Sequence, residues 1–231
     1  MRGALRWTTA HESSQLRPQH RTGPAARGTI GRMSLQCATT LVLARHGEAE
    51  YESSTWEVEG GSLTTLGRAQ AAELADRLAG RRVAHVWTST LARAVQTGEI
   101  AAARLGVAVT TRNDLVEFDI GDLAGAPRDT DPCAEAYAAW LAGDLDLRIP
   151  GGESGTEVVT RIRGVLDEIV DAHRGETVLV VGHGGALRLA VPLLARLDSG
   201  PFRISNCATI EIEADDDAWV CRSWDPAPEE G

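Results

Sequence analysis

The stretch TLVLARHGE, residues 40–48, joins a continuous apolar run to a polar turn that contains an arginine, a histidine and a glycine. A run such as Thr40–Ala44 is typical of a strand that is covered on both faces, as in the parallel sheets of α/β proteins. In open sheets of this kind, ligands bind beyond the carboxyl ends of the strands. We therefore expect Arg45 and His46 to lie at a ligand-binding edge of a sheet.

Outward from this stretch, strand and helix patterns alternate. This alternation predicts an α/β fold, a three-layer α/β/α sandwich with a largely parallel central sheet. The most hydrophobic run, Thr177–Gly182, should be central. The predicted strands are Thr40–Ala44, Val83–Thr88, Val107–Thr111 and Thr177–Gly182, with a closing hairpin of Ala208–Ala214 and Trp219–Trp224. The predicted helices are Leu63–Ala79, Leu91–Arg104, Ala134–Leu141, a helix from Ser154 to Ala172, and Gly184–Arg196.

Local signals support two of these helices. Ser154 and Glu157 have the spacing of a capping box, which starts a helix. A buried stripe should follow at Val158, Ile162, Val165 and Ile169. In the first helix we expect Leu66, Leu74 and Leu78 near the buried face.

The composition fits one compact domain, because 43% of the 231 residues are hydrophobic. We assign this domain to residues 37–231. Residues 1–36 lack periodicity, so we expect either a disordered extension or an over-extended gene start with Met33 as the true first residue. An Arg-rich, acid-poor segment also fits a transit peptide. The apolar runs are too short to span a bilayer, and four widely separated cysteines favour a reducing, cytoplasmic location.

Charge is distributed unevenly along the chain. The net charge is −10, yet residues 1–33 carry +5, so the remainder carries −15. An acidic body repels nucleic acid and anionic membranes, and we expect neither as a partner. A small phosphorylated substrate is compatible with this charge, because a local pair of arginines outweighs a diffuse field at contact range. The sequence does not define the oligomeric state and leaves a homodimer open.

Two histidines follow predicted strands, and glycine lies next to each of them. His46 follows the first strand, and His183 follows the central one at the start of a helix. Glycine-rich backbone at a helix N-terminus offers free N–H groups to an anion. A single histidine at a strand end is more often a surface or hydrogen-bonding residue, but two in this arrangement indicate a site. Neither a metal site nor a dinucleotide-binding motif has the required spacing here.

Six segments occur in a recognisable order. They are RHGE (45–48), LTTLG (63–67), TSTLARAVQT (88–97), LVE with Gly121 and Gly125 (115–125), PGGES (150–154) and VGHGG (181–185). Together they resemble the motifs of the histidine phosphatase superfamily, which includes the cofactor-dependent phosphoglycerate mutases. The resemblance covers residues 39 to about 213, and it implies a phosphoglycerate mutase-like fold.

The resemblance implies roles for individual residues. It makes His46 the nucleophile and Glu117 the general acid, while Arg45, Arg93 and His183, with Gly184, bind the phosphate. This assignment is chemically coherent, since arginine forks stabilise phosphoryl oxygens and a neutral imidazole can attack near pH 7. It requires no metal and no cofactor. Taken without the motif order, Arg93 and Glu117 could each be a solvated charge, and PGGES only a turn and a helix cap.

The expected activity is that of a metal-independent phosphomonoesterase that acts on a small phosphorylated metabolite through a phosphohistidine. Two alternatives stay open: a cofactor-dependent phosphoglycerate mutase, and a catalytically weak phospho-ligand-binding regulatory protein. The second is motivated by Glu52, which replaces an asparagine that often contacts phosphate in the family. Against the mutase, its usual Tyr-Gly pair and Arg-rich insertion are missing.

Acidic residues are concentrated in the two loops where specificity should lie. They are Glu48, Glu50, Glu52, Glu57 and Glu59 in one loop and Asp119, Asp122, Asp129 and Asp131 in the other. If they form the rim of the site, they favour a substrate with one phosphate on a neutral or cationic body. We interpret Arg68, Arg161 and Arg188 as surface or structural residues.

Overall fold

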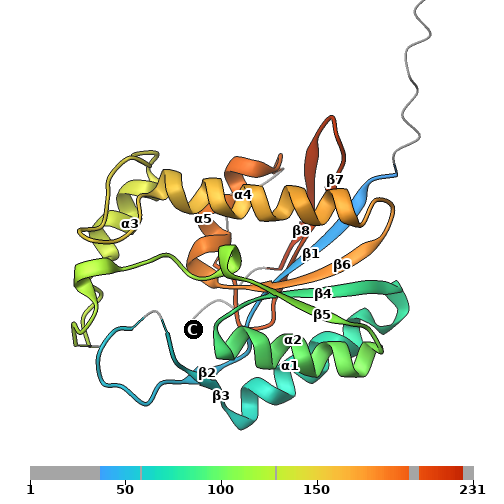
Figure 1. Cartoon of the computed structure of the whole chain (residues 1–231), viewed down its shortest axis with the longest axis horizontal. Helices are drawn as coiled ribbons and strands as arrows, with labels where there is room; N and C mark the ends of the chain where they lie inside the picture. Colours follow the sequence, from blue (N-terminus) through green and yellow to red (C-terminus); the bar gives the residue numbers. More distant parts are fainter. Residues whose placement is uncertain (1–36, 58, 128, 198–202, 226–231) are drawn as a thin grey trace, which may run out of the picture. The chain divides into compact units, whose positions relative to one another are not determined.

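The computed structural model describes residues 37–57, 59–127, 129–197 and 203–225. Our predictions for residues 1–36 lie outside this part of the chain. The main sheet has the strand order β5-β4-β6-β1-β7-β8 (Figure 1). Its strands are β1 (Thr39–Arg45), β4 (Val83–Ser89), β5 (Val109–Arg112), β6 (Thr177–Gly182), β7 (Thr209–Ala214) and β8 (Trp219–Trp224). A second, two-stranded sheet pairs β2 (Ala49–Glu50) with β3 (Ser62–Leu63).

The predicted sheet topology is confirmed. Strand β6 lies inside the sheet and pairs in parallel with both β4 and β1, and β4 also pairs in parallel with β5. Strands β7 and β8 form the predicted antiparallel hairpin, and β7 is antiparallel to β1. The four parallel strands therefore end at one common edge of the sheet.

Helices cover both faces of the main sheet. In Figure 1, α1 and α2 lie on one side, and α4 and α5 lie on the other. The alternation along β1 agrees with this, because Leu41 and Leu43 belong to the core beneath α4 and α5, while Val42 and Ala44 belong to the core beneath α1 and α2. The helices are α1 (Thr65–Leu78), α2 (Ala92–Leu105), α3 (Ala134–Leu141), α4 (Gly155–Ala172) and α5 (Gly184–Leu194).

The capping box at the start of α4 is present. The Ser154 side chain accepts from the Glu157 amide, and the Glu157 side chain accepts from the Ser154 amide. The predicted stripe of Val158, Ile162, Val165 and Ile169 is buried. No helix in the described parts of the chain has the length and hydrophobicity that crossing a membrane requires.

Helix α1 differs from its prediction at the N-terminal end. Residues 62 and 63 pair with β2 instead of starting the helix. Thr64 is the N-cap, and its side chain accepts from the Gly67 amide. The buried stripe starts at Gly67, so Leu66 is rotated by about 100° from it and is 53% exposed. The prediction that Leu66 faces the core was wrong.

Two other boundaries differ from their predictions by two residues. Strand β5 begins at Val109, two residues later than predicted, and α5 ends at Leu194 instead of Arg196. Pro192 lies inside α5. It cannot donate a helical hydrogen bond, and this weakens the last turn of the helix.

Candidate active site

The topology brings His46 and His183 together. Strands β1 and β6 are parallel neighbours in register, with Arg45 opposite Gly182. The next residue of each strand is therefore a histidine at the same edge of the sheet. The His46 amide donates to the Gly182 carbonyl at 3.0 Å. The two imidazole rings lie 5.2 Å apart between centroids, tilted by 55°.

His46 is held in one tautomer. Its Nδ1 lies 2.7 Å from the carbonyl oxygen of Gly47. A carbonyl oxygen can only accept, so Nδ1 carries the proton and Nε2 keeps its lone pair. The side chain is buried, and burial lowers its pKa to about 3, with a further decrease from the charges of Arg93 and Arg45 and an opposing contribution from the Gly47 hydrogen bond. At neutral pH the imidazole is therefore uncharged and has a nucleophilic Nε2.

His183 lies against His46 and is almost completely buried, at 1% exposure. Its Nε2 forms a 2.7 Å hydrogen bond with the Ser89 hydroxyl at the end of β4. Its pKa lies well below 6.5, chiefly because burial disfavours the charged ring. The nearby His46, Arg93, Arg161 and Arg45 lower the pKa further. Its Nδ1 has no hydrogen-bond partner among the described residues. This side chain is a neutral imidazole with one nitrogen available to a ligand.

Arg45 and Arg93 line the pocket in front of His46. One nitrogen of Arg45 donates to the Ile204 carbonyl at 3.1 Å, and one of Arg93 donates to the Gly60 carbonyl at 2.8 Å. A Cβ at Gly184 would lie 3.2 Å from Cδ of Arg45, so a glycine here lets the arginine lie across the N-terminus of α5. The two guanidinium groups place permanent positive charge beside His46.

Glycines also fix the loop that carries His46. A Cβ at Gly67 would lie 2.0 Å from the carbonyl oxygen of Glu48, and one at Gly47 would lie 2.6 Å from that of Gly67. Such distances are too short for any side chain. The Gly47 amide donates to the Thr97 hydroxyl on α2 at 3.0 Å. The first turn of α1 is thus packed directly on the backbone that follows His46.

Glu117 faces the first turn of α5. Its carboxylate accepts from the amides of Gly185 at 3.0 Å and Ala186 at 2.7 Å, and from that of Phe118 at 3.2 Å. These hydrogen bonds hold the carboxylate at the N-terminus of α5, where Glu117 lines the same pocket as His46.

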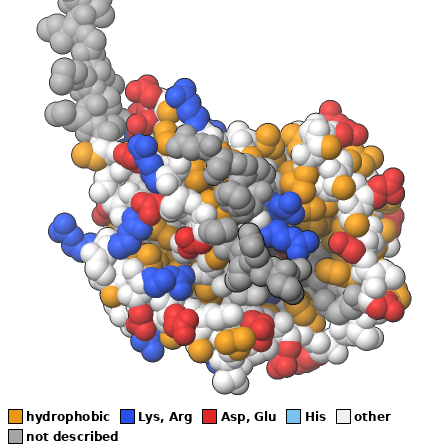
Figure 2. Space-filling model, turned by 180° about the vertical axis from the view of Figure 1, so that it is seen from behind, with side chains coloured by type: hydrophobic (Ala, Val, Ile, Leu, Met, Phe, Trp, Pro, Cys, Tyr) orange, Lys and Arg blue, Asp and Glu red, His pale blue; other side chains and the backbone are white. Residues whose placement is uncertain are grey.

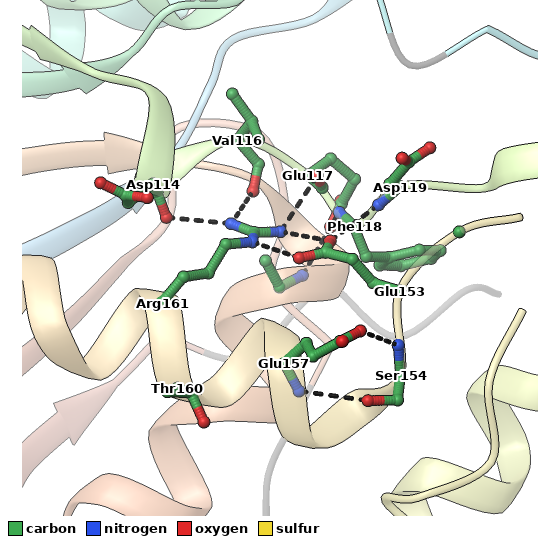
Figure 3. Close-up of polar contacts among 12 residues, drawn as sticks. Asp114, Val116, Glu117, Phe118, Asp119, Glu153, Ser154, Glu157, Thr160 and Arg161 are labelled. Atoms are coloured by element: carbon green, nitrogen blue, oxygen red, sulfur yellow. Dashed lines mark hydrogen bonds and ion pairs between the residues drawn. The ribbon is translucent and has the colours of Figure 1, made fainter.

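Arg161 holds the segment that carries Glu117 (Figure 3). It donates to the carbonyl groups of Asp114, Val116 and Glu117 at 2.8–3.2 Å. Its other contact is a two-fold ion pair with Glu153, at 2.7 and 2.9 Å. The PGGES motif thus provides more than a turn and a cap, because Glu153 orients the arginine that fixes the backbone of Glu117.

The pocket is larger than a phosphate group requires. Its volume is about 570 Å³, and two further arginines line it: Arg188, which we interpreted as a surface or structural residue, and Arg203. Aromatic side chains also line it, from Tyr51, Trp56, Phe118 and Tyr137. Arg188 follows Gly184 by four residues, so helical spacing could have placed both on one face. Arg203 lies in an irregular segment, where the sequence carries no comparable signal.

The expected acidic rim is mostly absent from the described pocket lining. Of the nine acidic residues in the two loops, only Glu57 and Asp131 line it. Glu50, Glu52, Glu57 and Glu59 line an adjoining hollow that shares Tyr51 and Glu57 with the pocket, and the side chain of Asp119 accepts from the Gly121 amide instead. On the face shown in Figure 2, acidic side chains are scattered among arginines and hydrophobic side chains. The prediction of an acidic rim was therefore wrong for most of these residues.

The burial of His46 has a consequence for stability. Its pKa is about 3 in the folded chain, against 6.5 for an exposed histidine. The unfolded state therefore binds more protons as the pH falls from 6.5 towards 3, and folding stability decreases in this range. His46→Asn removes this titration. As the pH falls from about 6 to about 4, we expect the unfolding free energy of the variant minus that of wild type to rise by about 1 kcal/mol per pH unit. Urea unfolding of both proteins measures it, and parallel pH profiles would refute it.

The comparisons with known proteins agree with this geometry. Residues 41–226 match the model of the histidine phosphatase superfamily (branch 1). Phosphoglycerate mutase-like protein 4 of Arabidopsis thaliana is 32% identical over 80% of this chain and 84% of its own. A probable phosphoglycerate mutase, GpmB, of Salmonella choleraesuis is 31% identical over 80% of this chain and 89% of its own.

Solved structures of similar proteins include two that cover nearly all of their own chains. A mycobacterial glucosyl-3-phosphoglycerate phosphatase, in complex with VO3, has a TM-score of 0.66 at 27% identity, covering 81% of this chain and 99% of its own. YhfR of Bacillus stearothermophilus has a TM-score of 0.65 at 29% identity, covering 83% of this chain and 98% of its own.

Proposed function

The chain belongs to the histidine phosphatase superfamily, and from this premise we propose that it is a metal-independent phosphomonoesterase that acts on a small phosphorylated metabolite. The observation that carries the proposal is the orientation of His46. Its Nδ1–H donates to the Gly47 carbonyl, which leaves Nε2 as the nucleophile beside Arg45 and Arg93. The phosphoryl group would pass first to this nitrogen and then to water.

In the first step, Nε2 of His46 attacks phosphorus and the bond from phosphorus to the ester oxygen breaks. Arg45 and Arg93, with His183 and the amide of Gly184, would hold the phosphoryl oxygens, on which charge develops in the transition state. Glu117, once protonated, gives its proton to the leaving alkoxide. The products of this step are an alcohol and phosphohistidine.

In the second step, the Glu117 carboxylate takes a proton from water, and the resulting hydroxide attacks the phosphorus. The phosphorus–nitrogen bond breaks and its electron pair returns to Nε2 of His46. Orthophosphate leaves, and Glu117 is again protonated for the next cycle. Each group ends as it began, so the chain's own residues suffice for turnover.

The two alternatives differ in their support. The curated relatives named above carry mutase names, whereas the mycobacterial structure is that of a phosphatase. A mutase remains the second candidate, because the pocket contains arginines beyond Arg45 and Arg93. The motivation for the weak phospho-ligand-binding protein is reduced, because Glu52 is exposed and is not among the residues that line the pocket beside His46.

A comparison of two acceptors tests the proposal. We expect phosphate release from small phosphomonoesters to continue with a chelator present, because arginine and histidine supply the positive charge. We expect it to exceed turnover in a coupled assay with 3-phosphoglycerate and catalytic 2,3-bisphosphoglycerate. Faster mutase turnover would replace the phosphatase by the mutase, and loss of phosphate release with chelator would show that a metal is needed.

A further inference from the structure

The peptide unit between Gly47 and Glu48 is held from both sides. Its carbonyl oxygen, which belongs to Gly47, accepts from Nδ1 of His46 at 2.7 Å. Its N–H, which belongs to Glu48, donates to the side-chain oxygen of Gln70 on α1 at 2.7 Å. One peptide bond therefore joins the Gln70 side chain to the His46 ring in a single chain of hydrogen bonds. Gln70 is not among the residues that line the pocket, so it can act on the ring only through this peptide.

Hydrogen bonds in such a chain polarise one another. A peptide group whose N–H donates strongly carries more negative charge on its carbonyl oxygen, and this oxygen is then a better acceptor. The Gly47 carbonyl accepts the Nδ1 proton of His46, so a better acceptor here increases the electron density of the ring. The Nε2 lone pair becomes more nucleophilic. The positive charge that the ring acquires when Nε2 bonds to phosphorus is also better stabilised.

The preceding peptide unit, between His46 and Gly47, is held by other elements. Its carbonyl oxygen accepts from the side chain of Asn206 at 2.8 Å. Its N–H donates to the Thr97 hydroxyl on α2 at 3.0 Å. These contacts fix the backbone of His46 without any help from Gln70.

Glu48 also has contacts with α1 that do not involve Gln70. Its carbonyl oxygen accepts from the Thr64 amide at 3.1 Å, and its carboxylate accepts from the Thr64 hydroxyl at 2.8 Å. Gly67 packs on the same carbonyl oxygen and leaves no room for a Cβ. The specific contribution of Gln70 is thus an acceptor for the Glu48 N–H, and its removal should leave the loop in place.

We propose that Gln70 is a positioning residue for the reaction: through the peptide between Gly47 and Glu48, it strengthens the hydrogen bond at Nδ1 of His46 and makes Nε2 a better nucleophile. The inference rests on the proposed function, in which Nε2 attacks phosphorus. If Gln70 only filled space, any side chain of its size could replace it. If it acts through the hydrogen bonds, its replacement must carry an oxygen acceptor.

Two substitutions of similar size separate these roles. Gln70→Met removes the acceptor, whereas Gln70→Glu keeps an oxygen whose charge strengthens the hydrogen bond from the Glu48 N–H. In a single turnover of a small phosphomonoester, we expect Gln70→Met to slow phosphohistidine formation by roughly 3- to 10-fold. Gln70→Glu should restore most of the rate. The Kd of Gln70→Met for orthophosphate should equal that of wild type, because the pocket lining is unchanged.

Gln96 on α2 provides the matched control. Its side-chain oxygen accepts from the Leu63 amide at 2.8 Å, which is the same kind of contact outside the chain that leads to His46. Gln96→Met should therefore form phosphohistidine at the wild-type rate.

The ¹⁵N chemical shift of Nδ1 in His46 gives a second readout that needs no turnover. It is measured through the carbon-bound ring protons of protein labelled at histidine, and it is assigned by its absence in His46→Ala. A stronger hydrogen bond from Nδ1 moves this shift downfield. We expect an upfield change in Gln70→Met, a downfield change in Gln70→Glu and no change in Gln96→Met. If Gln70→Met fails to fold, the sign of the change in Gln70→Glu still decides.

The outcomes separate this inference from the proposed function. An unchanged Nδ1 shift in the folded Gln70 variants, or equal rate losses in Gln70→Met and Gln70→Glu, would overturn the positioning role and leave the phosphatase intact. A rate loss in Gln70→Met with an equal rise in the Kd for orthophosphate would also overturn it, because this indicates a distorted pocket. The expected shifts in a protein whose wild type forms no phosphohistidine would reject the proposed function and support the coupling of Gln70 to the His46 ring.

Discussion

His46→Ala should lower phosphate release by roughly 10⁴-fold or more, because removal of a covalent nucleophile leaves no equivalent group in its place. Water could attack the bound ester directly in the variant, but it would lack the fixed position of Nε2. That position comes from burial and from the hydrogen bond between Nδ1 and Gly47. Steady-state rates with a small phosphomonoester measure the loss.

A histidine outside the pocket provides the matched control. His85 on β4 is partly buried and hydrogen-bonded to Thr110, so His85→Ala removes an imidazole without touching the site. We expect its rate to stay within a few-fold of wild type. If His46→Ala kept a comparable rate, His46 would not be the nucleophile.

Glu117→Gln should have the second largest effect, and the size of the effect should depend on the leaving group. An alkoxide must be protonated as it departs, whereas a nitrophenolate largely needs no proton. We expect a loss of roughly 10²–10⁴-fold on alkyl phosphates and a much smaller loss on nitrophenyl phosphate. Glutamine keeps an oxygen for the amides of α5, so the change removes the proton but little of the packing.

The control for this variant is Glu73→Gln, an exposed carboxylate on α1, which should leave both rates unchanged. The informative quantity is the ratio of the two losses in Glu117→Gln. A ratio near one would mean that Glu117 positions the substrate or α5 and does not transfer a proton.

The parts of the site that follow strands could be predicted from the sequence. Apolar runs before His46 and His183 identified two parallel strands, and parallel neighbours end at the same edge of a sheet. The structure places the two rings 5.2 Å apart. The apolar run of each strand and the contact between the two histidine rings have the same physical cause, because both depend on strands that are buried on both faces of the sheet.

The parts that depend on side-chain direction could not be predicted in this way. Leu66 fits an apolar helix pattern, yet the Thr64 cap and the pairing of residues 62 and 63 set the helix register that exposes it. The acidic loops carry negative charge in the sequence, but their backbone turns most of these carboxylates away from the pocket. Loop composition does not specify such directions.

Two arginines illustrate the same limit. Arg161 is a structural residue as expected, but its partners come from two distant segments, Asp114–Glu117 and Glu153. Arg188 could have been placed on the Gly184 face by its spacing of four residues, since side chains at this spacing share a helix face. That it lines the same pocket as Arg45 and His46 is visible only in three dimensions.

The measurement that tests the central claim most directly is the chemical identification of the phosphorylated intermediate. Wild-type protein is mixed with a phosphomonoester, quenched in base during turnover and digested, and the labelled peptide is sequenced by mass spectrometry. We expect phosphate on His46 in an acid-labile, base-stable form, and none in His46→Ala. A wild-type enzyme that releases phosphate with no labelled His46, or with the label on another residue, would contradict the account.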